Sequence, residues 1–203
     1  MILLRAKHLS KKFNQNIIFE DLSLEYSEGV LGISGANGSG KSTLMKCLAY
    51  LLRPNSGKVE WLVDGKQIDQ KRVKSLSGFT APYINLYAEL SVIENLRFLI
   101  EAGGKSADEI KLKELLERVQ TTRLENQLFG SLSTGQQQRV KLAAALVRDP
   151  DILLLDEPGS NLDEKGHSLV SGIIKEAKLN GKLVILASND PAEIDLCDQV
   201  ISL

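Results

Sequence analysis

GANGSGKST, residues 35–43, follows directly on the apolar run VLGIS, residues 30–34. It fits the pattern G-x-x-x-x-G-K-[ST] of a phosphate-binding loop. The glycines let backbone N–H groups approach phosphate oxygens, and the N-terminus of the next helix adds its positive dipole end. The sequence therefore predicts an α/β fold in which a buried strand runs into a loop for nucleotide phosphates.

The loop supplies the first set of candidate binding residues. We expect Lys41 to reach the β- and γ-phosphates and the Ser42 hydroxyl to ligate Mg²⁺. The alternative, a glycine turn with a surface lysine, is less favoured because the pattern falls between a predicted strand and a predicted helix. The expected phosphate contacts come from Gly35, Asn37, Gly38, Ser39, Gly40, Lys41, Ser42 and Thr43.

Bulk composition narrows the class of protein. The chain has 203 residues, with 25 Lys and Arg against 26 Asp and Glu, so no basic excess points to nucleic acid as a partner. Its two cysteines form no CxxC pair, which predicts reduced thiols rather than a disulfide framework. There is no signal-peptide pattern and no apolar run long enough to span a membrane. We expect a soluble, cytoplasmic protein.

Patterning divides the chain into three parts. The first part, up to about Asp69, is rich in short β-like runs with turn signals. A helix is expected from Lys41 to about Leu52, stopped by Pro54. Two continuous apolar runs near the end, Ile152–Leu155 and Leu183–Ala187, are typical of parallel strands covered by helices on both faces.

The middle of the chain, roughly residues 83–148, reads as helical. SVIENLRFLIEAGG is expected to form an amphipathic helix that ends at its two glycines. Ser106 and Glu109 match a capping box before the next helix, and GQQQRVKLAAALVRDP predicts a third helix. The expected organisation is one domain over 1–203, with a nucleotide-binding core at 1–82 and 149–203 and a helical insertion at 83–148.

Two carboxylates end the strand DILLLDEP. An aspartate at the end of a buried apolar strand is unfavourable unless it meets a cation, so Asp156 is expected to share Mg²⁺ with Ser42. Glu157 is expected to face the γ-phosphate and polarise the attacking water as a general base. Two carboxylates that merely begin a loop are the alternative, which the phosphate-binding loop makes less favoured.

LSTGQQQRV, residues 132–140, identifies the family. Alone it would be an ordinary helix cap. Together with the two earlier motifs, it resembles the signature of ABC-type ATPases, usually written LSGGQ. SNLD, with Ser160 and Asp163, resembles that family's D-loop. Phe13 stands where family members carry the aromatic that stacks on adenine; a core phenylalanine is the alternative.

The resemblance covers the whole chain and implies a P-loop NTPase (ABC ATPase) fold. Such a fold has a parallel sheet, an N-terminal antiparallel β subdomain and the helical insertion as the signature subdomain. It implies ATP and Mg²⁺ as ligands, ATP hydrolysis, and a head-to-tail homodimer or heterodimer in which one copy's signature covers the other copy's nucleotide. The signature residues are Ser133, Thr134, Gly135 and Gln136.

The resemblance also implies a partner: a separate membrane permease that holds the chain at the inner face of the cell membrane. The compact length and LSVIENLRFL look most like exporter-type ATPases, including the haem-exporter subunit of cytochrome c maturation. A soluble ABC ATPase acting on nucleic acid or ribosomes is the alternative from another class. A slow nucleotide-sensing module is a third.

Two positions depart from the family pattern. Members place a glutamine that contacts Mg²⁺ and the attacking water where this chain has Pro82, and proline offers no side-chain hydrogen bond. Members place a histidine at the γ-phosphate where this chain has Asn189 in VILASND. An asparagine donates a neutral hydrogen bond without the imidazolium charge. We therefore expect slow hydrolysis by Glu157, unless Asn189 substitutes adequately or a partner completes the site.

Overall fold

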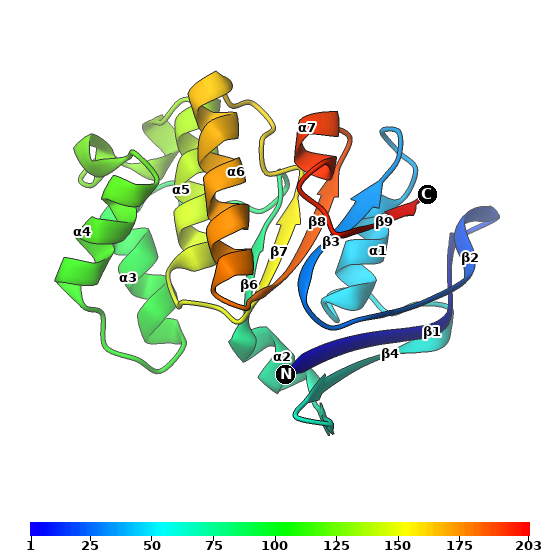
Figure 1. The fold of residues 1–203 in the computed structure, drawn as a ribbon. Helices are drawn as coiled ribbons and strands as arrows, with labels where there is room; N and C mark the ends of the chain where they lie inside the picture. The colour runs from blue at the N-terminus through cyan, green and yellow to red at the C-terminus, as the bar shows by residue number, and fades with distance from the viewer.

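The computed structural model describes residues 1–203, and its strands pair into two sheets (Figure 1). One sheet is antiparallel, in the order β2-β1-β4-β5, and the other is parallel, in the order β6-β7-β8-β3-β9. The antiparallel strands are β1 (Ile2–Phe13), β2 (Asn16–Tyr26), β4 (Ser56–Val63) and β5 (Lys66–Ile68). The parallel strands are β6 (Ser77–Thr80), β7 (Ile152–Asp156), β8 (Leu183–Ser188), β3 (Gly29–Ser34) and β9 (Gln199–Ser202). The parallel arrangement predicted for the apolar runs is confirmed.

Helices cover both faces of the parallel sheet and extend beyond its β6 edge. None of them is long and apolar enough to cross a lipid bilayer. The helices are α1 (Lys41–Leu48), α2 (Gln70–Leu76), α3 (Val92–Ala102), α4 (Glu109–Arg118), α5 (Thr134–Leu146), α6 (Glu164–Leu179) and α7 (Pro191–Ile194), with short 3-10 turns at Thr122–Leu124 and Phe129–Ser131.

The central strands alternate their side chains between two cores. In β7, Leu154 packs into the core that holds α1, whereas Leu153 packs into the core that holds α6. In β8, Ile185 packs into the core that holds α1, and Val184 packs into the core that holds α6. Because successive strand residues point to opposite faces, a strand that is apolar throughout is stable only when both faces are covered. This explains the continuous apolar runs of the sequence.

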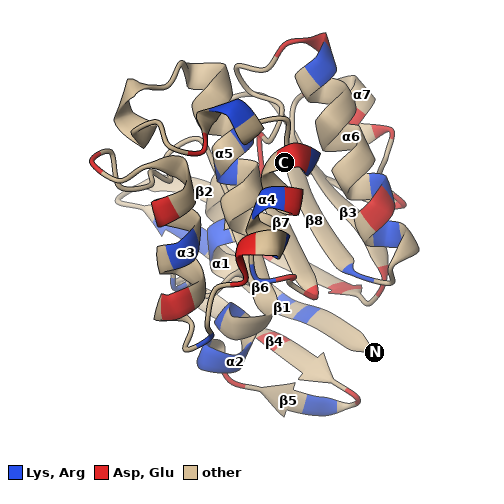
Figure 2. Ribbon diagram, turned by 90° about the vertical axis from the view of Figure 1, so that its left-hand side faces the viewer, with Lys and Arg blue, Asp and Glu red and all other residues tan.

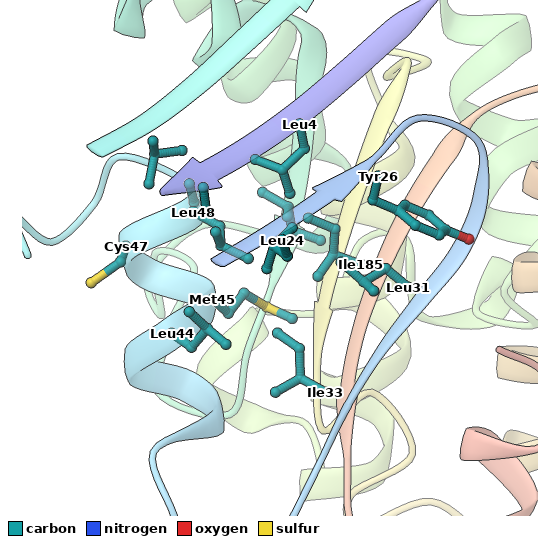
Figure 3. Packing of buried hydrophobic residues seen from close by; sticks show 14 of the residues in the cluster. Leu4, Leu24, Tyr26, Leu31, Ile33, Leu44, Met45, Cys47, Leu48 and Ile185 are labelled. Carbon is teal, nitrogen blue, oxygen red and sulfur yellow. The ribbon is translucent and has the colours of Figure 1, made fainter. Parts of the chain in front are cut away.

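Helix α1 lies between the two sheets (Figure 3). Its Leu44, Met45 and Leu48 are fully buried. Burying one such side chain contributes roughly 1.5–3 kcal/mol, so this helix joins the sheets and is held in place directly after the phosphate-binding loop. The neighbouring side chains include Leu4 and Leu24 from the antiparallel sheet and Leu31, Ile33 and Ile185 from the parallel sheet.

The predicted end of this helix at Leu52 is wrong, because α1 ends at Leu48. In a longer helix the Leu48 carbonyl would accept from the Leu52 N–H. Instead the indole of Trp61 donates to the Leu48 carbonyl at 2.8 Å, and the Leu52 N–H donates to Lys46. Tyr50 adopts a positive φ of 56°. A side chain from β4 therefore ends the helix before Pro54.

A third core joins α3, α4 and α5. A Ser91 capping box that was not predicted begins α3, and the predicted Ser106 capping box is wrong. Asp108 caps α4 instead, accepting from Ile110 N at 3.0 Å, while the Glu109 carboxylate pairs with Arg97 of α3. Figure 2 shows positive and negative residues interspersed on these two helices. The Glu109 carboxylate, which the predicted Ser106 capping box requires, is therefore bound to Arg97 instead.

Candidate functional site

The glycine loop connects β3 to α1 over residues 35–40. Gly38 and Gly40 have φ values of 84° and 111°, which side chains rarely adopt. A Cβ on Gly40 would also collide with Ile18 of β2. The Ser39 hydroxyl is buried without a hydrogen-bond partner. The sequence needs glycine here because the backbone turns sharply at the N-terminus of α1.

Lys41 is the first residue of α1, and its side chain is only 6% exposed. Its ammonium donates to the carbonyls of Gly35 at 2.8 Å and Ala36 at 3.3 Å. The same Nζ lies 3.2 Å from Oε1 of Glu157. One cation thus joins the glycine loop to the carboxylate of Glu157, the residue after β7.

Asp156 is the last residue of β7 and is completely buried. Neither of its carboxylate oxygens has a hydrogen-bond partner of good geometry. Burial raises the pKa of this carboxyl, although the nearby hydroxyls of Ser42 and Tyr83 lower it. A buried carboxylate without a partner is unfavourable unless a cation reaches it. The oxygens of Asp156 and Ser42 are therefore a donor set that fits Mg²⁺.

Glu157 turns away from the strand with a φ of 47°. Its N–H donates to the carbonyl of Ala187 in β8 at 2.8 Å. A left-handed conformation in a residue other than glycine is strained by about 1–3 kcal/mol and occurs frequently at functional sites. Here the bend lets the carboxylate leave the sheet axis and face Lys41.

Asn189 follows β8 and faces the glycine loop. Its side-chain amide donates to Oδ1 of Asn37 at 2.9 Å, so residues far apart in sequence meet across the site. Both residues line a cavity of about 450 Å³. Its lining includes Asn37, Pro82, Glu157, Ser160, Asn189 and Glu193. The predicted loop, general base and asparagine thus share one cavity at the carboxyl ends of the parallel strands, where α/β sheets bind ligands.

Comparison with known proteins identifies the family. A model described as "ABC transporter" matches residues 19–160. The uncharacterised ABC transporter ATP-binding protein YdbJ of Bacillus subtilis is 36% identical over 98% of this chain. The methionine import ATP-binding protein MetN 2 of Pectobacterium atrosepticum is 34% identical over 98%. The chain spans less than two thirds of these relatives, 65% and 63% of their lengths.

The chain belongs to the ABC transporter family of ATP-binding domains. Among solved structures, the ATP-binding cassette MJ0796, described as dimeric, post-hydrolysis and bound to ADP and Pi, superposes with a TM-score of 0.86. It is 26% identical, and the match covers 98% of this chain and 94% of that one. The predicted fold, a P-loop NTPase with an added antiparallel sheet, is therefore confirmed.

The signature of this ABC domain begins α5. Ser133 caps the helix, and its N–H and hydroxyl form a capping box with Gln136. Thr134 and Gly135 are the first two residues of the helix. None of these four residues lines the cavity beside Glu157 and Asn189. Their roles at a nucleotide stay predictions.

The D-loop residues lie between the cavity and the signature. The Ser160 hydroxyl is buried without a partner beside the cavity. Asp163 caps α6 and accepts from Arg139 of α5 at 2.8 Å. A Cβ on Gly135 would lie 3.0 Å from the Asn161 carbonyl, so D-loop and signature pack together.

Phe13 ends β1 and is 48% exposed, with the Lys11 ammonium 4.9 Å from its ring centre. It is not the core phenylalanine of the alternative interpretation. An exposed ring at a strand end is available for stacking on a planar ligand. Adenine stacking stays a prediction, since Phe13 does not line the cavity at Glu157.

Sequence reasoning missed Tyr83, the residue after Pro82. Burial and the neighbouring Asp156 raise the pKa of its hydroxyl, and the Lys46 ammonium lies 3.7 Å from its ring centre. Pro82 itself contributes only its carbonyl, which accepts from Lys141 at 3.0 Å. No sequence signal marked Tyr83, because a tyrosine in a loop is common and its neighbours come from α1 and β7.

Proposed function

We propose that this chain is an ATP-hydrolysing subunit that powers a transporter through a separate membrane permease. The observation that carries the proposal is the convergence of Lys41, Asp156 and Glu157 at the carboxyl ends of the parallel strands. A cation for the phosphates, a buried carboxylate for a metal and a second carboxylate for water are the groups that phosphoryl transfer needs. The names of the relatives, ATP-binding proteins of transporters, support the same function.

Each group has a role in the proposed reaction. The loop N–H groups and Lys41 hold the phosphates, while Ser42 and Asp156 hold Mg²⁺. Bound Mg²⁺ neutralises charge on the phosphate oxygens. Glu157 orients and polarises the attacking water, and Asn189 donates a hydrogen bond toward the transferred group. Phe13 stacks on the adenine.

Phosphate release from ATP tests this function. The wild-type chain should release phosphate only when Mg²⁺ is present. Lys41→Ala should lose most nucleotide binding as well as hydrolysis, because the ammonium that faces the loop is gone. Lys58→Ala, at an exposed pair with Glu60 on β4, is the matched control and should behave as wild type. ATP binding that survives equally in Lys41→Ala would refute the proposed site.

A head-to-tail dimer completes the proposal. Residues 133–136 lie outside the cavity of their own copy, and the neighbour MJ0796 is described as dimeric. We propose that the signature of one copy covers the nucleotide of the other, with the N-terminus of α5 aimed at the γ-phosphate. Residues 83–148 then act as a signature subdomain beside a core of 1–82 and 149–203. The permease partner, the position at the inner membrane face and the exporter type are part of the same proposal.

Mixing two inactive variants tests the dimer. Ser133→Asp keeps a good helix cap but places a negative charge against the γ-phosphate of the other copy. Lys41→Ala removes the phosphate contact. An equal mixture should regain activity, roughly a quarter of wild type if subunits exchange at random, because a heterodimer contains one intact composite site. Ser133→Asn is the control, since it caps without charge. No recovery on mixing contradicts the head-to-tail arrangement.

A slow nucleotide sensor is a second candidate, favoured by Asn189 and Pro82. The Pro82 side chain offers the transferred phosphate no hydrogen bond, and Asn189 offers it only an uncharged one. A sensor should bind ATP tightly and convert less than one equivalent over hours. Single-turnover and steady-state measurements on the same preparation separate the two functions.

A further inference from the structure

Three side chains beside the cavity form a cluster that the proposed ATP reaction does not use. His167 lies on α6, while Asp190 and Glu193 belong to the start of α7. The His167 Nδ1 lies 3.4 Å from Asp190 Oδ2 and 3.9 Å from Glu193 Oε1. One ligand atom from each residue falls within 4.8 Å of the other two. The fold therefore brings an imidazole and two carboxylates together from separate helices.

Glu193 is the buried member of the cluster. Its side chain is 4% exposed, and its Oε1 has no hydrogen-bond partner although it faces His167. Burial raises the pKa of this carboxyl, whereas the Ser188 hydroxyl and His167 lower it and the carboxylates of Asp190 and Glu157 raise it again. An unpartnered buried oxygen loses the full benefit of hydration. A cation at the cluster would supply the missing partner.

Gly159 leaves the space between the ligands open. A Cβ at this position would lie 2.8 Å from the His167 Nδ1 and would also collide with Glu193 Oε1. Asp190 is oriented as well, because its Oδ1 accepts from Ala192 N at 2.9 Å and its Oδ2 faces His167. The absence of a side chain at 159 is thus required for the imidazole and the buried carboxylate to meet.

The separations match a tetrahedral metal site. With metal–ligand bonds of about 2.0–2.1 Å, two ligands of a tetrahedral ion lie about 3.4 Å apart. The 3.4 Å between His167 Nδ1 and Asp190 Oδ2 matches this value, whereas Glu193 Oε1, at 3.9 Å from the same nitrogen and within 4.8 Å of Asp190, must move inward to bind the same ion. An imidazole favours zinc and similar transition metals, whereas Mg²⁺ prefers oxygen ligands alone.

We propose that His167, Asp190 and Glu193 bind a divalent transition-metal ion of the zinc type, with a fourth position open to the cavity. The site joins α6, which follows the D-loop, to α7, which follows Asn189. It is separate from the Mg²⁺ position expected at Ser42 and Asp156. It needs neither nucleotide nor hydrolysis, so it can be tested even if the proposed function fails.

Histidine NMR tests the site, because the chain contains only two histidines. His8 is a built-in control, since its Nδ1 lies 2.6 Å from Asp21 on the exposed face of β1 with no third ligand in its cluster. The protein, labelled with ¹⁵N in its imidazoles, is titrated with zinc chloride at pH 7.5 without nucleotide. One equivalent should shift the Nδ1 signal of His167 and leave that of His8 unchanged.

Titration calorimetry measures the zinc affinity of the wild type and of variants. Wild type and His8→Ala should bind one zinc ion with a Kd of about 10 µM or tighter. His167→Ala should lose at least about tenfold, and so should Asp190→Asn, which keeps the helix cap but removes the charge. Glu193→Gln, checked for folding by circular dichroism, should do the same. Asp156→Asn should retain this site.

Three results would overturn the proposal. The first is the absence of stoichiometric zinc binding by the folded wild type. The second is zinc binding that survives unchanged in His167→Ala. The third is loss of the tightest site in Asp156→Asn alone, since this would place the ion at the expected Mg²⁺ position instead.

Discussion

Lys41 and Glu157 form an ion pair across the site, with Nζ 3.2 Å from Oε1, although Lys41 follows β3 and Glu157 follows β7, far along the chain. The lysine side chain is 6% exposed and the glutamate 22%. The pair is therefore only partly screened by water, and each residue orients the other. The Lys41 ammonium also donates to the carbonyls of Gly35 and Ala36 in the loop.

Neutralising Glu157 should separate binding from hydrolysis. Glu157→Gln keeps the size of the side chain but removes the base, so phosphate release should fall by about 10²–10⁴-fold while ATP binding is retained. Phosphate release and nucleotide titration measure the two effects. Glu164→Gln, in the exposed first turn of α6, is the matched control. Equal turnover in Glu157→Gln and wild type would exclude Glu157 as the base.

Replacing Asn189 by histidine should accelerate hydrolysis. The position already faces the glycine loop through Asn37, so an imidazole there can reach a phosphate on Lys41. One well-placed donor accounts for up to about 10²–10³ in rate, and we expect Asn189→His to gain roughly ten- to a hundredfold. Asn189→Ala separates this gain from simple loss of the Asn37 contact. If Asn189→His is no faster, asparagine already serves the site.

Replacing Asp156 should stabilise the ligand-free protein and remove its response to Mg²⁺. Burial raises the pKa of this carboxyl, so its ionisation opposes folding. The neutral Asp156 carboxyl makes its full contribution to the free energy of unfolding at low pH. This contribution is lost as the pH rises through the raised pKa of the folded protein. Asp156→Asn removes that loss, and a gain of about 1 kcal/mol would raise Tm by roughly 2–4 °C at pH 7.

Calorimetry at several pH values checks this prediction. The difference in Tm between Asp156→Asn and wild type should shrink as the pH falls below the ordinary aspartate pKa of about 3.9, because the carboxyl is then neutral in both the folded and the unfolded chain. Added Mg²⁺ and ATP should raise Tm in wild type much more than in the variant. A variant less stable than wild type at pH 7 would contradict the buried, unpartnered carboxylate.

Two glycine-to-alanine changes should have opposite effects. A Cβ on Gly78 of β6 would collide with the Ala145 carbonyl of α5, so Gly78→Ala should destabilise the fold by about 1–3 kcal/mol. Gly172 lies in α6 with open space around it, and Gly172→Ala should stabilise by about 0.5–1 kcal/mol. Urea unfolding measures both. Similar midpoints for the two variants would refute the close packing of α5 on β6.

The two cysteines should react slowly in the folded protein. Burial raises the pKa of Cys47 and of Cys197 to about 11. At pH 8 their thiolate fractions should be about a hundredfold below that of a free thiol. Alkylation should therefore rise about tenfold per pH unit up to pH 10, and denaturant should remove the protection. Rapid labelling of folded protein at pH 8 would contradict this prediction.

The sequence determined the order of the motifs and the residues predicted to form the site. The glycine pattern of residues 35–43 restricts the backbone locally, and the apolar runs of β7 and β8 require two covered faces. These signals are local or periodic, so they can be read without coordinates. Asp156 and Glu157 were identifiable because polar residues at the end of a buried strand need a partner.

Tertiary structure alone decided where α1 ends and which side chains meet. The Trp61 indole donates a hydrogen bond to the Leu48 carbonyl, and the Arg97 guanidinium donates one to the carboxylate of Glu109. Tyr83 reaches Asp156, and His167 reaches Glu193, through contacts between elements far apart in the chain. Sequence patterns report a residue's own strand or helix, whereas these pairings depend on how packed elements are positioned relative to one another.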